Sequence, residues 1–365
     1  MVRNCCSLFY VFLTLLVFSL YINAEAVEYR IIDLGTLGGS YGRGMAINEY
    51  GQVAGYSLLP GFPGQTRAAL WQDGLVYNLG TLGGDTSRAH DINNSGFVVG
   101  YSSTSARLTR AFIYDGAEMT ELPALGGASG VAWGINDNNL VVGWANLADG
   151  YYHAALWDND GYIQDLGTLG GKYSVAYDIN SFGVIVGSSD DSSGKEYGFI
   201  WHNGEITKIN PYPGGSWCTA RGINDSGQII LWGDSLTSNG QAILYSDGNY
   251  LNLGTFGGDE AWAYGINNLG HVVGWAKLTQ GNYHAFIYDG IEKTDLGTLG
   301  GLFSSAYGIN DRGMITGWAQ TDSGETHAVM WVPIPEPSSL TLIIAGLVII
   351  SILFTRKYTA GKIKN

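Results

Sequence analysis

The chain has 365 residues, of which 55 are glycine and 14 % are charged. Frequent glycine indicates many turns and 13 % aromatic residues favour strands, so the composition excludes a disordered acidic polymer and an ordinary helical enzyme. Between Val27 and Pro335 there are 13 Lys or Arg and 30 Asp or Glu, and a net charge near −17 argues against nucleic acid as a partner. We expect an all-β protein.

Residues 1–26 have the features of a secretory signal peptide. Arg3 provides a positive start, residues 8–22 form an apolar run, and Ala24-Glu25-Ala26 is a small-x-small cleavage pattern. We therefore expect an exported protein whose mature chain begins at Val27.

Cysteine usage agrees with this reading. Cys5 and Cys6 lie in the expected leader, so its removal leaves Cys218 alone and excludes an internal disulfide. We interpret Cys218 as a free, buried thiol rather than a reactive one.

A glycine-rich hexamer divides the rest of the chain into copies. LGTLGG occurs four times, at residues 34–39, 79–84, 166–171 and 296–301, and three degraded copies end in the same Gly pair. The first glycines of the pairs are Gly38, Gly83, Gly126, Gly170, Gly214, Gly257 and Gly300. The intervals are 43 to 45 residues, which is the length of one four-stranded propeller blade.

The copy that starts at Gly83 shows the expected strands. They are Ser87–Asn93, Gly96–Ser102, Arg110–Gly116 and Ala117–Leu125. Short connections rich in Asn, Asp, Ser and Gly separate them, as antiparallel hairpins require, and no stretch has a helical period.

The two ends of the array complement each other. The last copy has three strand-like stretches and stops at Pro333, while the orphan stretch Glu28–Gly35 matches the fourth strand of the other copies. A ring closed in this way leaves no open strand edge. Residues 27–332 are thus predicted to form a seven-bladed β-propeller with four antiparallel strands per blade, closed by Arg30–Leu34.

The recurring residues have structural interpretations. The hexamer is read as the link between blades, where Gly tolerates positive φ, because a phosphate-binding loop would need a following Lys and a helix. An Ile-Asn pair is read as the start of a hairpin turn. Its seven asparagines are Asn48, Asn93, Asn136, Asn180, Asn224, Asn267 and Asn310. Calcium binding by the adjacent Asp137, Asp225 and Asp311 is the alternative.

Aromatic residues recur on the predicted second and third strands and are expected to pack between adjacent sheets. Those of the third strand are Trp71, Tyr114, Trp157, Trp201, Tyr245, Tyr288 and Trp331. Those of the second strand are Tyr56, Tyr101, Trp144, Trp232, Trp275 and Trp318, with Ser188 as the exception.

Nothing in the sequence predicts catalysis, a metal site or a cofactor. His153, His284 and His327 share one position in the repeat, so a ring would hold them too far apart to bind one metal. The nucleophile motif with Ser between two glycines is absent, and no pair of carboxylates stands out from the repeat.

The C-terminal segment predicts a membrane anchor. Residues 333–339 form a linker, residues 340–355 an apolar transmembrane helix, and residues 356–365 a basic cytoplasmic tail. This orientation places the propeller outside the cytoplasm. Pro335, Glu336 and Pro337 precede the apolar run, and the basic residues Arg356 and Lys357 follow it.

Two families are similar to parts of this sequence. The chain resembles the HAF-repeat family of bacterial extracellular repeat proteins in its third-strand sequences HAALW, HAFIY and HAVMW and in the motifs GIN and LGTLGG. The Pro-Glu-Pro tripeptide, the apolar span and the basic residues resemble a PEP-CTERM sorting signal. This second resemblance implies recognition by an exosortase in the inner membrane and transfer of the body to the cell surface or the extracellular matrix.

The leading functional hypothesis is a non-enzymatic surface or biofilm-matrix protein that binds polysaccharide or another partner. Links between blades and loops between second and third strands emerge on one face, where the variable segments lie. Aromatic residues there could stack on sugar rings or merely cover the seams between blades. They are Tyr41, Tyr173, Trp217, Phe303, Tyr151, Tyr152 and Tyr283.

Two alternatives stay open. A polysaccharide lyase or hydrolase would need a cluster in the central funnel that breaks the repeat symmetry, and the divergent fifth copy offers Cys218, Arg221 and Asp234. A passive structural component of the matrix would need no ligand.

Overall fold

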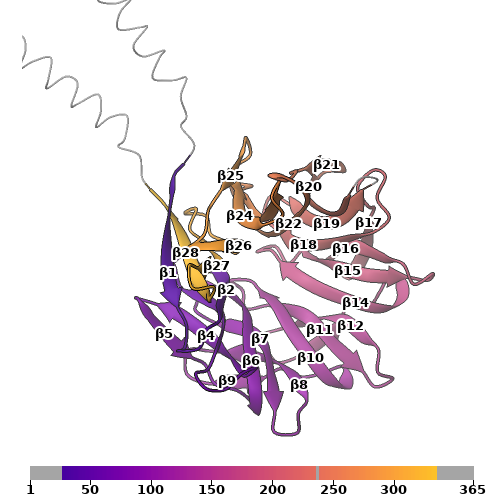
Figure 1. The fold of residues 1–365 in the computed structure, drawn as a ribbon. Helices are drawn as coiled ribbons and strands as arrows, with labels where there is room; N and C mark the ends of the chain where they lie inside the picture. Colours follow the sequence, from indigo (N-terminus) through magenta and orange to yellow (C-terminus); the bar gives the residue numbers. More distant parts are fainter. Residues whose placement is uncertain (1–26, 236–237, 335–365) are drawn as a thin grey trace, which may run out of the picture. The chain divides into compact units, whose positions relative to one another are not determined.

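A computed structural model describes residues 27–235 and 238–334. Every regular element in this part of the chain is a β-strand (Figure 1). Residues 31–332 form one compact unit, and outside it the structure describes residues 27–30 and 333–334, where the Ile334 amide donates to the Glu28 carbonyl at 2.8 Å. No helix in the described part is long and apolar enough to span a membrane. The expected leader and C-terminal anchor lie outside the described residues.

Each copy contributes strands in the same order. The inner strands are β2 (Gly42–Ile47), β6 (Gly83–Ile92), β10 (Gly126–Ile135), β14 (Gly170–Ile179), β18 (Cys218–Ile223), β22 (Gly257–Ile266) and β26 (Gly300–Ile309). The second strands are β3 (Val53–Leu58), β7 (Val98–Thr104), β11 (Val141–Leu147), β15 (Ile185–Asp191), β19 (Ile229–Ser235), β23 (Val272–Leu278) and β27 (Ile315–Thr321). The third strands are β4 (Thr66–Gln72), β8 (Thr109–Tyr114), β12 (Tyr152–Trp157), β16 (Glu196–His202), β20 (Ser238–Ser246), β24 (Tyr283–Tyr288) and β28 (Thr326–Pro333). The fourth strands are β5 (Leu75–Asn78), β9 (Met119–Glu121), β13 (Ile163–Asp165), β17 (Glu205–Ile209), β21 (Asn249–Asn252), β25 (Lys293–Asp295) and β1 (Tyr29–Gly35).

These strands form antiparallel sheets that follow one another around a central axis (Figure 1). Five sheets have four strands each, and a sixth has eight. The eight-stranded sheet consists of two antiparallel groups, β18–β21 and β22–β25, which are joined by one parallel pair between Gly240 and Glu260. The prediction of an all-β chain with four-stranded antiparallel units is confirmed.

The first and last strands share a sheet, in the order β1-β28-β27-β26. The His327 ring Nδ1 lies 2.8 Å from a carboxylate oxygen of Asp33, which is 294 residues away in sequence. Leu34 packs against a buried cluster that includes Trp71 and Ala328. The same His-Asp pair occurs within the third and sixth copies, at 2.9 Å for His153 with Asp165 and 2.8 Å for His284 with Asp295. The N-terminal strand therefore replaces the missing fourth strand of the last copy, as expected.

The two glycines of each pair are required for different structural reasons. The first glycine has a positive φ, for example 96° at Gly83 and 98° at Gly300, which an L side chain rarely adopts. The second glycine lies against the end of the second strand, where a Cβ on Gly39 would approach the Leu58 carbonyl oxygen to 2.6 Å. The sequence repeats the pair because one position needs the backbone conformation and the other needs the space.

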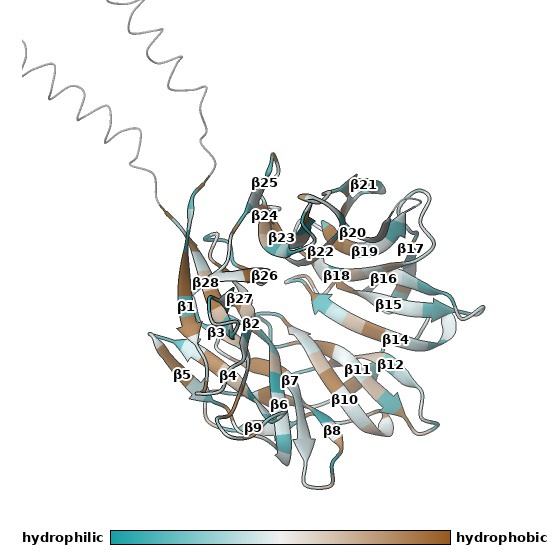
Figure 2. Ribbon diagram, in the orientation of Figure 1, coloured by the Kyte–Doolittle hydropathy of each residue, from teal (hydrophilic) through white to brown (hydrophobic). Residues whose placement is uncertain are grey.

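The core lies between successive sheets. One buried cluster joins Val142 and Ala154 of the third copy to Ala176, Ile185 and Phe199 of the fourth. Hydrophobic residues alternate with less hydrophobic ones along the strands (Figure 2). Several third-strand aromatics are among the most buried side chains, with 1 % exposure for Trp157 and 0 % for Trp331. The predicted core role is confirmed for the four third-strand tryptophans, whereas Tyr114, Tyr245 and Tyr288 are partly exposed.

Strand boundaries differ from the prediction at both ends of a copy. In the second copy the inner strand begins at Gly83 rather than Ser87, so the Gly pair belongs to the strand and only the residues before it form the link. The fourth strand is limited to Met119–Glu121, and the Leu122 amide makes one further hydrogen bond to the Ala111 carbonyl at 2.9 Å.

Candidate functional site

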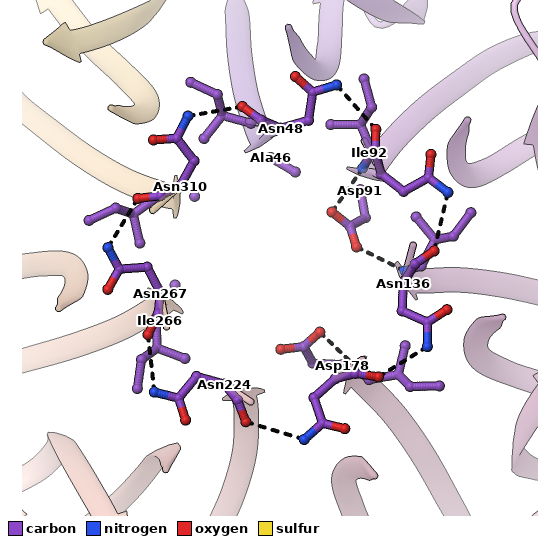
Figure 3. A pocket seen from close by; sticks show the side chains of 18 of the residues that line it. Ala46, Asn48, Asp91, Ile92, Asn136, Asp178, Asn224, Ile266, Asn267 and Asn310 are labelled. Carbon is purple, nitrogen blue, oxygen red and sulfur yellow. Dashed lines mark hydrogen bonds between the residues drawn. The ribbon is translucent and has the colours of Figure 1, made fainter. Parts of the chain in front are cut away.

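Seven asparagines form a closed belt around the central axis (Figure 3). Each side-chain amide donates to the backbone carbonyl of the equivalent asparagine in the next copy, at 2.9 to 3.2 Å, and Asn310 donates to Asn48. The side-chain oxygen accepts amides of its own turn, as Asn267 does from Leu269 at 3.1 Å and His271 at 2.9 Å. The predicted hairpin role of the Ile-Asn pair is confirmed, and the same side chains also connect the copies.

The acidic residues beside the belt bind backbone amides. Asp137 accepts from the Asn94 amide at 2.8 Å, Asp225 from Ser181 at 2.9 Å, and Asp311 from Asn268 at 2.8 Å. Among the described residues, no group of three or more His, Cys, Asp or Glu side chains is placed to hold a metal ion. These contacts account for the three aspartates as links between copies.

Inside the belt lies a cavity of about 420 Å³, into which Asp91 and Asp178 project (Figure 3). They stand two residues before their belt asparagines, where four other copies have glycine and the first has Ala46. Each carboxylate accepts the next amide of its own strand and an amide of the next copy, that of Ile135 for Asp91 and that of Ile223 for Asp178, all at 2.8 Å.

Burial in the cavity wall changes the protonation of both aspartates. It raises the pKa of Asp91 to about 8, and the neighbouring charge of Asp178 acts in the same direction against the two amide donors. Burial also raises the pKa of Asp178 to about 6. At neutral pH, Asp91 is therefore mostly protonated and Asp178 mostly ionised.

The residues three positions before the belt asparagines also line the cavity. They are Met45, His90, Trp133, Tyr177, Arg221, Tyr264 and Tyr307. The His90 and Trp133 rings stack with centroids 3.9 Å apart, and burial lowers the pKa of His90 to about 4. The Arg221 guanidinium lies 3.8 Å from the Tyr177 centroid and 4.0 Å from that of Trp232.

The cavity is electrostatically negative. Its lining contains the acidic side chains of Glu49, Asp137, Asp178, Asp225 and Asp311, in addition to the mostly protonated Asp91. The basic residue in the lining is Arg221, since His90 is neutral above pH 5 or so, given its lowered pKa of about 4. The prediction that no pair of carboxylates departs from the repeat is wrong: Asp91 and Asp178 do.

The signal for this pair was present in the sequence. The second and fourth copies read DIN where four others read GIN. Both aspartates lie on inner strands, and for Asp91 this agrees with the predicted strand Ser87–Asn93; the sequence does not show that the two carboxylates face one cavity.

The aromatic residues predicted to bind a ligand fall into separate groups. Tyr173 has ring centroids 5.5 Å from Tyr151 and 4.7 Å from Tyr152, and Tyr283 lies 4.8 Å from Phe303. Both groups join a third strand to the inner strand of the next copy, so they cover seams between copies. All of these rings keep some solvent exposure, which reaches 36 % for Tyr173.

The two remaining predicted residues lie at other seams. The Trp217 ring stacks on Trp262 with centroids 6.2 Å apart. Tyr41 forms a β-bridge with Thr326 of the last copy, and its ring lies 6.0 Å from that of Tyr56 in its own copy. The structure therefore does not bring the seven predicted residues together into one site.

The divergent residues of the fifth copy have separate surroundings. Cys218 is a free, buried thiol next to the Gly198 amide and the Ile209 carbonyl, and burial raises its pKa to about 11. Asp234 accepts the amides of Ser216 and Trp217. Arg221 is in the cavity wall. The buried, free state predicted for Cys218 is confirmed.

The fold and the axial cavity define a β-propeller. No protein-family model matches the sequence, and no curated protein matches it. Solved structures do match. A puromycin hydrolase mutant has a TM-score of 0.55 at 14 % identity, over 81 % of this chain and 55 % of that chain. A puromycin-hydrolyzing peptidase from Mycobacterium tuberculosis has a TM-score of 0.54 at 13 % identity, over 86 % and 53 %.

The β-propeller domain of the Trilobed protease from Pyrococcus furiosus is similar over more of its own length. It has a TM-score of 0.50 at 11 % identity, over 80 % of this chain and 93 % of that domain. This chain spans about half the length of the two peptidases above. At these identities the similarity establishes the fold and carries no activity to this chain.

Proposed function

We propose that this chain is an exported, seven-bladed β-propeller that binds extracellular polysaccharide without catalysing a reaction. Counting the eight-stranded sheet as two blades is supported by the single parallel pair that joins its halves. The asparagine belt supports the same count, since it passes once through each of the seven copies before it closes.

The observation that carries the binding proposal is the set of half-exposed aromatic rings on the face of the inter-copy links. Tyr151, Tyr152 and Tyr173 form the densest group, and Lys172 lies over Tyr151 with its ammonium nitrogen 4.7 Å from the ring centroid. Tyrosine rings offer an apolar surface together with a hydroxyl, which suits the apolar and polar faces of a sugar.

Export and sorting belong to the same proposal. The signal-like residues 1–26 would direct export, and the PEP-CTERM-like tail would engage the inner membrane and an exosortase-type enzyme before the propeller reaches the cell surface or the matrix. Replacement of Pro335, Glu336 and Pro337 by alanine is expected to keep the chain in the membrane fraction. Normal surface delivery of this variant would contradict the sorting step.

A glycan array probed with the full-length chain in detergent tests the binding function. We expect saturable binding to at least one polysaccharide, weakened by Tyr173→Ala and unaffected by Tyr162→Ala, an exposed tyrosine of the β12–β13 turn. A blank array combined with weaker biofilm in a deletion strain would favour a passive matrix component instead.

A polysaccharide-active enzyme is the second candidate, because of one observation. Asp91 and Asp178 share the cavity with pKa values raised to about 8 and about 6, so one carboxyl can donate a proton while the other is ionised. Cleavage of a polysaccharide that is lost in both Asp91→Asn and Asp178→Asn, but not in Asp73→Asn on an exposed turn, would establish it.

A further inference from the structure

Two arginines break the equivalence of the copies on the inner strands. Five residues before each belt asparagine stands a residue that pairs with the second strand. In five copies it is uncharged: Val131, Val175, Thr219, Trp262 and Ser305. In the first and second copies it is Arg43, paired with Tyr56, and Arg88, paired with Tyr101.

These arginines and two tyrosines make a continuous row. The Arg43 guanidinium lies 5.1 Å from the Tyr41 ring centroid, Tyr41 lies 6.0 Å from Tyr56, and the Arg88 guanidinium lies 4.5 Å from Tyr56. We call these four residues the arginine-tyrosine row. Its ends are cationic and its middle is aromatic.

The guanidinium groups of the row lack anionic partners. Within residues 27–235 and 238–334, neither has a nitrogen within 4.0 Å of a carboxylate oxygen, although acidic residues outnumber basic ones more than twofold. Arg43 donates one hydrogen bond, to the Tyr307 hydroxyl at 3.1 Å, and its buried Nε has no acceptor. Arg88 donates to the Thr66 hydroxyl at 3.4 Å.

Such a half-buried guanidinium is incompletely satisfied. Arginine has five N–H donors, and aromatic faces offset only part of the cost of removing its charge from water. A planar carboxylate matches the donor fork through two parallel hydrogen bonds. The Tyr41 ring, which keeps partial exposure, adds an apolar surface on which a sugar ring can lie, while Tyr56 is 6 % exposed and supports the Arg88 guanidinium from the core.

We propose that the arginine-tyrosine row binds the carboxylate groups of an acidic polysaccharide. This inference rests on the proposed function and specifies its ligand class as polymers rich in uronic acid. Tyr41 is one of the residues predicted to contact sugar, and the row extends that contact to charged groups. The two guanidinium groups of the row are partly exposed, and their local positive charge must outweigh the repulsion between an acidic polymer and a body of net charge near −17. The polymers are therefore compared at one near-physiological ionic strength.

Polygalacturonate and its fully methyl-esterified form provide matched probes, since esterification replaces each charged carboxylate by a neutral methyl ester and leaves the sugar backbone unchanged. The full-length chain in detergent is expected to bind polygalacturonate more tightly by about tenfold or more, in line with charge-assisted hydrogen bonds. The double variant Arg43→Gln/Arg88→Gln is expected to lose this preference. Arg312→Gln, at an exposed arginine of the β26–β27 turn, is the control and should keep it.

A second double variant controls for the possibility that the glutamine substitutions unfold the protein. Arg43→Lys/Arg88→Lys retains both charges but not the donor forks, so an intermediate preference is expected with an unchanged melting temperature. Equal binding of the two polymers by the wild type would overturn the inference and leave the proposed function standing. Binding of neither polymer would also overturn it, and the glycan array then decides whether the proposed function fails too.

Discussion

Asp91 and Asp178 occupy a backbone position that holds glycine in the copy following each of them. A Cβ on Gly222 would lie 3.6 Å from an oxygen of Asp178, which is an ordinary van der Waals distance. Each aspartate bridges two neighbouring inner strands through backbone amides. The arrangement stabilises the wall of the cavity, and its cost is the burial of charge.

This cost makes stability depend on pH. Burial raises the folded-state pKa of Asp91 from 3.8 to about 8, so its contribution is complete below pH 4 and is lost as the pH rises through about 8. The free energy of unfolding should fall by on the order of 1 kcal/mol per pH unit within this window. Asp91→Asn should flatten this dependence in urea unfolding between about pH 6 and 8, because the amide does not ionise, while the part below pH 6 that Asp178 contributes should remain.

The control for this prediction is Asp73→Asn on the exposed turn between β4 and β5, where the positive φ of 53° also suits asparagine. It should leave the slope unchanged. A constant difference between Asp91→Asn and wild type across the pH range would show that the carboxyl does not titrate in the folded protein.

At the scale of the element, the hairpin between an inner strand and the second strand also holds adjacent copies together. Asn267 is 4 % exposed and makes three hydrogen bonds, two within its turn and one to the Asn310 carbonyl. A tight turn alone would need only the first two. The third explains why the side chain is asparagine, which has both an acceptor and a donor, rather than aspartate.

Replacement of this side chain should therefore be costly. Asn267→Ala is expected to lower the free energy of unfolding by about 2 to 4 kcal/mol, because buried backbone groups lose their partners. Asn249→Ala, an exposed asparagine with one hydrogen bond of 3.4 Å, should change it by less than about 0.5 kcal/mol. Equal effects of the two substitutions in urea unfolding would contradict the role of the belt.

The repeat made the strands and their order predictable, because a period of 43 to 45 residues with a fixed Gly pair leaves few alternatives. The lining of the cavity was not predictable in the same way. A register shift between Ala89 and Asp91 interrupts the alternation of the inner strand, so both His90 and Asp91 line the cavity. A strict two-residue alternation along the strand would place His90 and Asp91 on opposite faces of the sheet.

Contacts between adjacent copies could not be predicted from the sequence either. Arg43 and Arg88 look like ordinary exposed charges in the sequence, and their stacking on rings of the preceding copy depends on how adjacent sheets pack. Loop positions alone predict the aromatic face. They do not distinguish rings that cover a seam between copies from rings that bind a ligand. Sequence therefore predicts what repeats, whereas the proposed acidic-polysaccharide site depends on two residues that depart from the repeat.

At the scale of the whole molecule, the N-terminal strand helps to close the array into a ring. Strand β1 belongs to the same sheet as β26, β27 and β28, and Leu34 packs in the cluster that joins this sheet to the first copy. Without β1, the edge of β28 would be open to solvent and to other chains. The asparagine belt would still be intact, so closure depends on two separate sets of bonds.

Deletion of residues 28–34 tests which set dominates. We expect a melting temperature lower by about 10 °C or more, together with aggregation and proteolysis at β28, because an exposed edge and a truncated core cluster act together. A synthetic peptide of residues 28–35, added in trans, should restore part of the stability by occupying the vacant edge. A scrambled peptide is the control. A deletion variant as heat-resistant as the full chain would show that the belt alone holds the ring, and the N-terminal strand would then be dispensable for closure.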